Sequence, residues 1–172
     1  MIKRARHKYT IGIDEVGRGP LAGPVAVGAV CIYREHLHRV KKLFPVVKDS
    51  KKLSPKMREE WRARIRVAEK MGYLVSTVSF VASNVIDKRG LSSAINKAIV
   101  MSLVAIQHDA ANTTVLLDGG LRAPAYYGNQ ETIIKGDEKE ISIALASIVA
   151  KVTRDARMVK LAKQFPQYGF EK

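Results

Sequence analysis

Two adjacent carboxylates, Asp14 and Glu15, follow an apolar segment and stand just before the sequence Gly17-Arg18-Gly19. Carboxylate oxygens are the natural ligands of hard cations such as Mg²⁺. Because glycine has no Cβ, the backbone N–H groups of such a turn can approach a phosphate or a sugar closely. A lone Asp-Glu pair is more often a strand that ends in a polar turn, so the metal-binding interpretation needs support from elsewhere in the chain.

Two further aspartates supply that support. Asp118 follows the apolar segment 113–117 and Asp137 follows the segment 131–134, and each stands beside a glycine. Acids at the ends of separate strands converge on one edge of an α/β sheet, where ligands bind. Three or four carboxylates gathered there could bind two Mg²⁺ or Mn²⁺ ions, an arrangement suited to phosphodiester hydrolysis. Taken singly, the Asp118-Gly119 pair is more typical of an ordinary turn.

Crowding of these acids has an electrostatic consequence. Like charges that are packed together disfavour the ionised form, and a bound metal ion reverses the effect. We therefore expect at least one carboxyl of the metal-free cluster to have a pKa above its ordinary value.

The chain has 172 residues and a net charge of +14, which predicts attraction to polyanions. A generally basic surface explains the charge equally well, and charge alone distinguishes neither DNA from RNA nor an enzyme from a binding protein. Basic surface combined with a focused acidic patch favours a metal-dependent nuclease. A structural nucleic-acid binder with incidental acids remains the alternative, and it predicts no metal binding at the acids.

The apolar segment 25–33 holds the only cysteine, Cys31, which we interpret as a small core residue. No apolar run is long enough to span a bilayer, and residues 1–9 are basic without the apolar core of a signal peptide. These features predict a protein of the reducing cytoplasm.

Periodicity and turn residues predict an α/β fold in one domain, with a mixed β-sheet flanked by helices. The expected strands are 9–14, 25–33, 73–81, 113–117 and 131–134. The expected helices are 55–70, capped by Ser54, then 91–110 and 141–165. In the last helix, the apolar residues spaced to face the core are Leu145, Ile148, Val149, Val152 and Val159.

The same helix carries a polar stripe of Ser147, Lys151 and Arg154. A hydroxyl and two cations on one stripe could receive a phosphate backbone, although a solvated polar face fits the spacing equally well. Asp155 is as consistent with a structural partner for a nearby base as with a ligand. The segment Asp49-Ser50-Lys51-Lys52 is either a phosphate-contacting loop or a charged one.

Five motifs together resemble the ribonuclease HII family, and their order and spacing span nearly the whole chain. They are GIDEVGRGPLAGP at 12–24, DSKKL at 49–53, LDG at 117–119, KGD at 135–137 and ASIVAKVTRD at 146–155. The resemblance implies a ribonuclease H-like fold. It implies endonucleolytic cleavage of RNA in RNA–DNA hybrids, and cleavage 5′ of single ribonucleotides embedded in duplex DNA, leaving 3′-hydroxyl and 5′-phosphate ends. It further implies a role in ribonucleotide excision repair and DNA replication, in a protein that we expect to be a monomer.

The resemblance also assigns roles to residues. It implies a catalytic, metal-binding set for Mg²⁺ or Mn²⁺ that consists of Asp14, Glu15, Asp118 and Asp137. It implies that Gly17, Arg18 and Gly19 sense the ribose 2′-hydroxyl, the group that separates RNA from DNA. The implied candidates for phosphate contact are Ser50, Lys51, Ser147 and Lys151.

Members of the family usually continue beyond a segment like Tyr168-Gly169-Phe170, into a loop whose tyrosine helps to recognise the DNA–RNA junction, whereas this sequence stops at Lys172. The second functional expectation is therefore an inactive or weakly active RNA–DNA hybrid-binding domain. On this basis we expect cleavage at single ribonucleotides to suffer more than cleavage of long hybrids.

Overall fold

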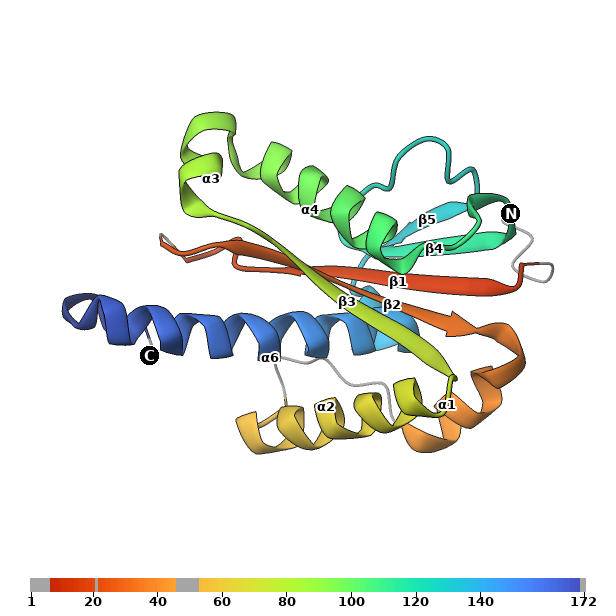
Figure 1. Cartoon of the computed structure of the whole chain (residues 1–172). Coiled ribbons are helices and arrows are strands. Elements are labelled where there is room, and N and C mark those ends of the chain that lie inside the picture. Colours follow the sequence, from red (N-terminus) through yellow and green to blue (C-terminus); the bar gives the residue numbers. More distant parts are fainter. Residues whose placement is uncertain (1–6, 21, 46–52, 171–172) are drawn as a thin grey trace.

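The computed structural model describes residues 7–20, 22–45 and 53–170, and it contains a five-stranded sheet of order β3-β2-β1-β4-β5 (Figure 1). The strands are β1 (Tyr9–Val16), β2 (Val25–Tyr33), β3 (Leu74–Val81), β4 (Thr113–Asp118) and β5 (Gln130–Ile133). The first three strands pair antiparallel, while β4 pairs parallel to β1 and β5 parallel to β4. The sheet is therefore mixed, as predicted.

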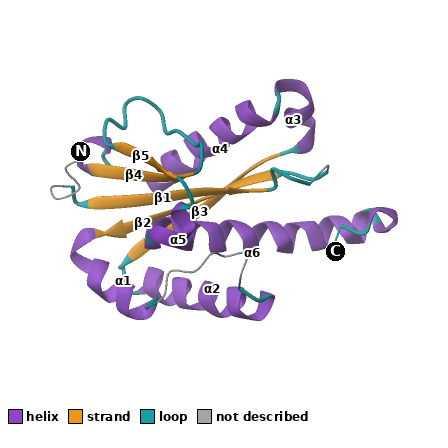
Figure 2. Ribbon diagram, turned by 180° about the vertical axis from the view of Figure 1, so that it is seen from behind, coloured by secondary structure: helices purple, strands orange, loops and turns teal. Residues whose placement is uncertain are grey.

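Helices cover both faces of this sheet. They are α1 (Leu37–Leu43), α2 (Pro55–Lys70), α3 (Ser83–Arg89), α4 (Leu91–Ile106), α5 (Gly136–Lys139) and α6 (Ile141–Gln164). Helices α3 and α4 lie over one face, and α6 crosses the other face with α2 beneath it (Figures 1 and 2). None of the helices in the described ranges combines the length and hydropathy needed to cross a membrane.

Each face of the sheet has its own apolar core, because side chains alternate between the faces along a strand. On the α4 side, Ile11, Ile13 and Cys31 pack among the buried residues of α4. On the α6 side, Val30 and Ile32 pack against α2 and α6. Cys31 is fully buried, which confirms its interpretation as a core residue, and this burial raises the pKa of its thiol to about 12.

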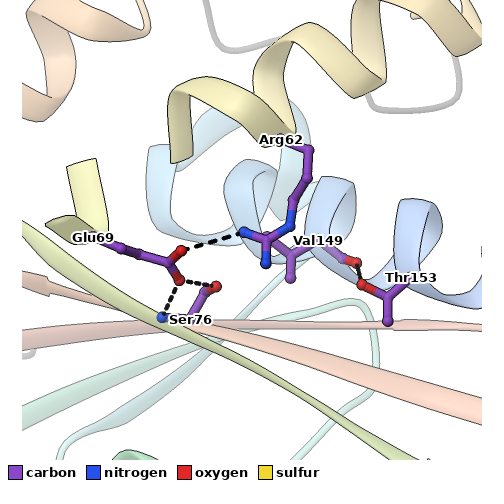
Figure 3. Close-up of polar contacts among 5 residues, drawn as sticks. All are labelled: Arg62, Glu69, Ser76, Val149 and Thr153. Atoms are coloured by element: carbon purple, nitrogen blue, oxygen red, sulfur yellow. Dashed lines mark hydrogen bonds and ion pairs between the residues drawn. The ribbon is translucent and has the colours of Figure 1, made fainter. Parts of the chain in front are cut away.

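Helix α2 begins as predicted, with the Met57 N–H donating to the Ser54 hydroxyl oxygen at 3.2 Å. Its C-terminal half is tied to β3 by a carboxylate (Figure 3). Glu69 accepts hydrogen bonds from the backbone N–H of Ser76, at 3.1 Å, and from the Ser76 hydroxyl, and it lies 3.5 Å from an Arg62 nitrogen. On the neighbouring α6, the Thr153 hydroxyl donates to the Val149 carbonyl at 2.7 Å.

The structure differs from the sequence predictions at several element ends. Strand β1 continues two residues beyond Asp14, and α4 stops at Ile106 rather than 110, because Gln107 adopts a left-handed conformation with φ of 56°. Helices α1, α3 and α5 were not predicted. Val159 was expected in the core and is 45% exposed, because the C-terminal part of α6 extends beyond the sheet (Figure 1).

Helix α6 lies unusually close to the sheet because two glycines face it. A Cβ at Gly12 of β1 would lie 2.1 Å from the backbone carbonyl carbon of Ser142, and one at Gly28 of β2 would lie 2.3 Å from the Ala146 carbonyl oxygen. The helix backbone therefore rests on the strand backbones themselves. This contact sets the distance between α6 and the sheet, and with it the position of Ser147, which follows Ala146.

Candidate active site

Asp14 is a buried carboxylic acid in β1, opposite Gly28 of β2, and only 7% of it is exposed. It hydrogen-bonds the side chain of Ser147 on α6, and one of its oxygens accepts the Glu15 backbone N–H at 2.8 Å. Burial raises the pKa of Asp14 to about 7; the Ser147 bond opposes the rise, and the charges of Glu15 and Asp118 add to it. The predicted carboxyl of raised pKa is confirmed, with burial rather than crowding as its main cause.

Asp118 lies beside Asp14 because β4 pairs parallel to β1, with Leu117 opposite Ile13. One Asp118 carboxylate oxygen accepts the backbone N–H of Gly136 at 2.6 Å. This bond brings the start of α5 to the end of β4. Gly136 was not among the predicted site residues, and the signal in the sequence was a glycine directly before Asp137.

Asp137 occupies a position different from the predicted strand end. Strand β5 stops at Ile133, the backbone turns through a left-handed conformation at Lys135, with φ of 55°, and Asp137 lies in the first turn of α5. Its side chain is buried.

Glu15 faces the opposite side of the sheet from Asp14, because neighbouring residues of a strand point to opposite faces. Its carboxylate lies 3.3 Å from an Arg18 guanidinium nitrogen, across the start of the turn that follows β1. Asp14 and Asp118 thus come together as predicted, while Glu15 is directed toward Arg18.

The carboxylates of Asp14 and Asp118 suit a hard cation, but they do not form a complete coordination site. Within residues 7–20, 22–45 and 53–170, no group of three or more His, Cys, Asp or Glu side chains is arranged to hold a metal ion. The fit lies in the chemistry of Asp14 and Asp118, two neighbouring carboxyls, the first of which has its pKa raised to about 7 by burial. A divalent cation between them would offset the cost of ionising Asp14.

The raised pKa of Asp14 predicts a pH-dependent stability. Between the unfolded value of 3.8 and the folded value of about 7 the native state binds more protons, so its stability falls as the pH rises through this window. We expect Asp14→Asn to be more stable than the wild type at pH 8, by at most about 4 kcal/mol, and to lose that advantage at pH 4. Urea unfolding in metal-free buffer measures both values; an equal difference at the two pH values would contradict the assignment.

The turn after β1 is constrained at one glycine and open at another. Gly17 has φ of 98°, and a Cβ there would lie 2.5 Å from Nε of Arg154 and 2.9 Å from the Pro24 carbonyl oxygen. At Gly19 a Cβ would meet no atom within 4 Å. Interior packing therefore requires glycine at position 17, whereas position 19 is free for the approach of a ligand.

The polar stripe of α6 divides into three different environments. Ser147 is buried against Asp14, and the Lys151 ammonium lies 2.7 Å from Asp155, which confirms the structural alternative for that aspartate. Arg154, predicted on the phosphate-facing stripe, is 5% exposed and donates from Nε to the Pro24 carbonyl at 3.0 Å. The predicted contacts of Ser50 and Lys51 fall outside the described residues.

A family model for ribonuclease HII matches residues 11–172, a range that contains every predicted site residue. The chain belongs to the ribonuclease HII family. The family consists of hydrolytic endonucleases, and ribonucleases H depend on metal ions. The resemblance found in the sequence is thereby confirmed.

Individual members of the ribonuclease HII family agree with this assignment. The chain is 40% identical to a ribonuclease HII of Caldicellulosiruptor bescii over 96% of its own length and 74% of that relative. It resembles the structure of ribonuclease H2 from Pyrococcus horikoshii with a TM-score of 0.72 at 26% identity, covering 94% of this chain and 79% of that one. A second likeness, with a TM-score of 0.69 at 31% identity over 91% of this chain and 77% of the other, is to the Archaeoglobus fulgidus enzyme solved as a PCNA:RNase HII complex. These likenesses confirm the ribonuclease H-like fold.

Proposed function

We propose that this chain is a metal-dependent endoribonuclease. It cleaves the RNA strand of RNA–DNA hybrids and cuts 5′ of single ribonucleotides in duplex DNA, leaving 3′-hydroxyl and 5′-phosphate ends. The observation that carries the proposal is the pairing of buried Asp14 with Asp118, on adjacent parallel strands of a ribonuclease HII chain. The sheet and its helices act as one catalytic domain of a cytoplasmic monomer, serving ribonucleotide excision repair and replication.

In this proposal, Asp14 and Asp118 would hold Mg²⁺ or Mn²⁺ where they stand, and the side chains of Glu15 and Asp137 would turn toward them on metal binding. Four carboxylates would then hold two ions. When bound, such ions would supply a nucleophilic water at neutral pH and stabilise the leaving oxygen of the phosphodiester. The protein's own contribution is orientation: the Ser147 side chain holds Asp14, and the Gly136 N–H holds Asp118. The net charge of +14 retains the duplex.

The test compares three duplexes of one sequence: a hybrid, a DNA duplex with one ribonucleotide, and an all-DNA duplex. We expect cleavage of the first two only, with Mg²⁺ or Mn²⁺ present, and end analysis should show 3′-hydroxyl and 5′-phosphate products. Cleavage of all three, or cleavage that survives chelation of divalent ions, would contradict the proposal. Binding of the hybrid without any cleavage would favour the alternative of a hybrid-binding domain.

The two turn glycines should respond differently to alanine. We expect Gly17→Ala to lower the free energy of unfolding by roughly 1–3 kcal/mol, because its methyl group meets Arg154 and Pro24 in a left-handed backbone. Gly19→Ala should stay within about 0.5 kcal/mol of wild type and yet weaken binding of the ribonucleotide-containing duplex, because only the ligand meets the new methyl group. Equal destabilisation by both, or normal binding by Gly19→Ala, would contradict these roles.

Lys151 should leave its ion pair with Asp155 when the duplex binds and contact one phosphate instead. We expect Lys151→Ala to reduce the slope of log affinity against log salt by about one unit. Lys70→Ala, which removes an exposed lysine at the end of α2, is the matched control and should leave the slope unchanged. An unchanged slope in Lys151→Ala would show that Lys151 makes no phosphate contact and is an ordinary solvated side chain.

A further inference from the structure

Arg154 is a buried cation that contacts the turn between β1 and β2 rather than solvent. Only 5% of the residue is exposed, and burial lowers the pKa of its guanidinium, with Asp155 opposing the shift. Its Nη2 atom is buried and finds no hydrogen-bond acceptor among the described residues. A buried charged group with an unsatisfied donor is costly, so its presence calls for an explanation.

The contacts of Arg154 join the two ends of the connection between β1 and β2. At the start of this connection, the Gly17 backbone packs against Arg154 so closely that a Cβ would lie 2.5 Å from Nε. At its end, the same Nε donates to the Pro24 carbonyl at 3.0 Å. Gly23 packs beside the same side chain, where a Cβ would lie 3.6 Å from Nη2. One side chain of α6 thus clamps both ends of the turn.

We propose that Arg154 is a positioning residue, which holds the Gly17–Gly19 turn in the orientation that recognises the ribose. The inference rests on the proposed function, in which this turn senses the 2′-hydroxyl. Arg154 acts through its Nε–H on the turn backbone and touches neither substrate nor metal. The helix that supplies Ser147 to Asp14 therefore also sets the turn, so that one rigid element aligns the metal-binding acid and the ribose-sensing backbone.

Two nearly isosteric variants separate this role from that of a phosphate-binding charge. In Arg154→Gln, the amide nitrogen occupies the same place along the side chain as Nε and can still donate to Pro24. In Arg154→Met, a methyl group occupies that place and cannot donate. Both variants remove the positive charge, so any difference between them reports on the hydrogen bond alone.

The first measurement is the affinity ratio between a duplex with one ribonucleotide and the identical all-DNA duplex, in metal-free buffer. We expect this affinity ratio to be the same in wild type and Arg154→Gln. In Arg154→Met the ratio should be lower by at least about fivefold. The slope of log affinity against log salt should be the same in all three proteins. If Gln and Met variants behave alike, or both reduce the slope by about one unit, Arg154 acts as a charge and the proposal is overturned.

The second measurement does not depend on substrate recognition. Amide hydrogen exchange at Gly17 and Gly19 should be faster in Arg154→Met than in wild type, and unchanged in Arg154→Gln. If wild type shows no preference for the ribonucleotide but exchange follows this pattern, the ribose-sensing role of the turn fails while the clamp stands. If exchange is equal in all three proteins, the clamp itself is refuted.

The wild-type chain provides a check should Arg154→Met fail to fold. The Arg154 Nε–H resonance should shift on addition of the ribonucleotide-containing duplex and stay in place with the all-DNA duplex. An equal shift with both duplexes would overturn the proposal.

Discussion

Replacing Asp118 by asparagine should abolish cleavage while leaving the protein folded. The asparagine oxygen can still accept the Gly136 N–H, so the junction of β4 with α5 is retained. An amide cannot balance the charge of a hard cation, and therefore the loss falls on the chemical step. We expect kcat/KM to fall at least roughly 100-fold, with unchanged affinity for the hybrid in metal-free buffer.

The matched control is Asp87→Asn, which makes the same chemical change at an exposed position on α3. It should cleave at the wild-type rate. Near-normal cleavage by Asp118→Asn at saturating Mg²⁺ would remove Asp118 from the metal-binding set. A loss of hybrid binding equal to the loss of cleavage would assign it to substrate contact instead.

Alanine at Gly28 should cause a large loss of stability. A methyl group there would lie 2.3 Å from the Ala146 carbonyl oxygen and 3.0 Å from the Ala150 Cβ, so α6 must move away from the sheet. Because the clash is with helix backbone rather than with a flexible side chain, we expect a loss of about 3 kcal/mol or more in urea unfolding. Lifting α6 would also separate Ser147 from Asp14.

Gly128→Ala is the control for this substitution, because a Cβ at Gly128 would meet nothing within 4 Å. It should stay within about 0.5 kcal/mol of wild type. A loss below about 1 kcal/mol in Gly28→Ala would show that the helix adjusts freely, and that its height above the sheet does not constrain the site.

The paired aspartates could be predicted from sequence, because each follows an apolar run that forms a strand. Asp118 does end β4, and the family motifs around it are specific. The parallel pairing of β1 with β4 could not be derived from local pattern, since it depends on how distant strands assemble. The side to which Glu15 points depends on where β1 ends, and β1 continues to Val16 rather than stopping at Asp14.

Arg154 shows why helical spacing alone misassigns a residue. Its spacing from Ser147 and Lys151 predicts one polar stripe, but the depth of each residue depends on what covers it. The covering group is the Pro24 carbonyl, 130 residues away in the chain, and no periodicity in α6 reports its presence. The position of Asp137 also differs from the predicted strand end. The left-handed turn that leads to it is made by Lys135, and a lysine gives no sequence indication of such a conformation.

The central claim, that the carboxylates at this sheet edge hold the catalytic ions, is tested most directly by anomalous X-ray scattering. Crystals of this chain grown with Mn²⁺ should show anomalous density between the carboxylates of Asp14 and Asp118, and crystals of Asp118→Asn should lose it. Manganese bound only elsewhere, in a chain that cleaves the ribonucleotide-containing duplex with Mn²⁺, would contradict the account.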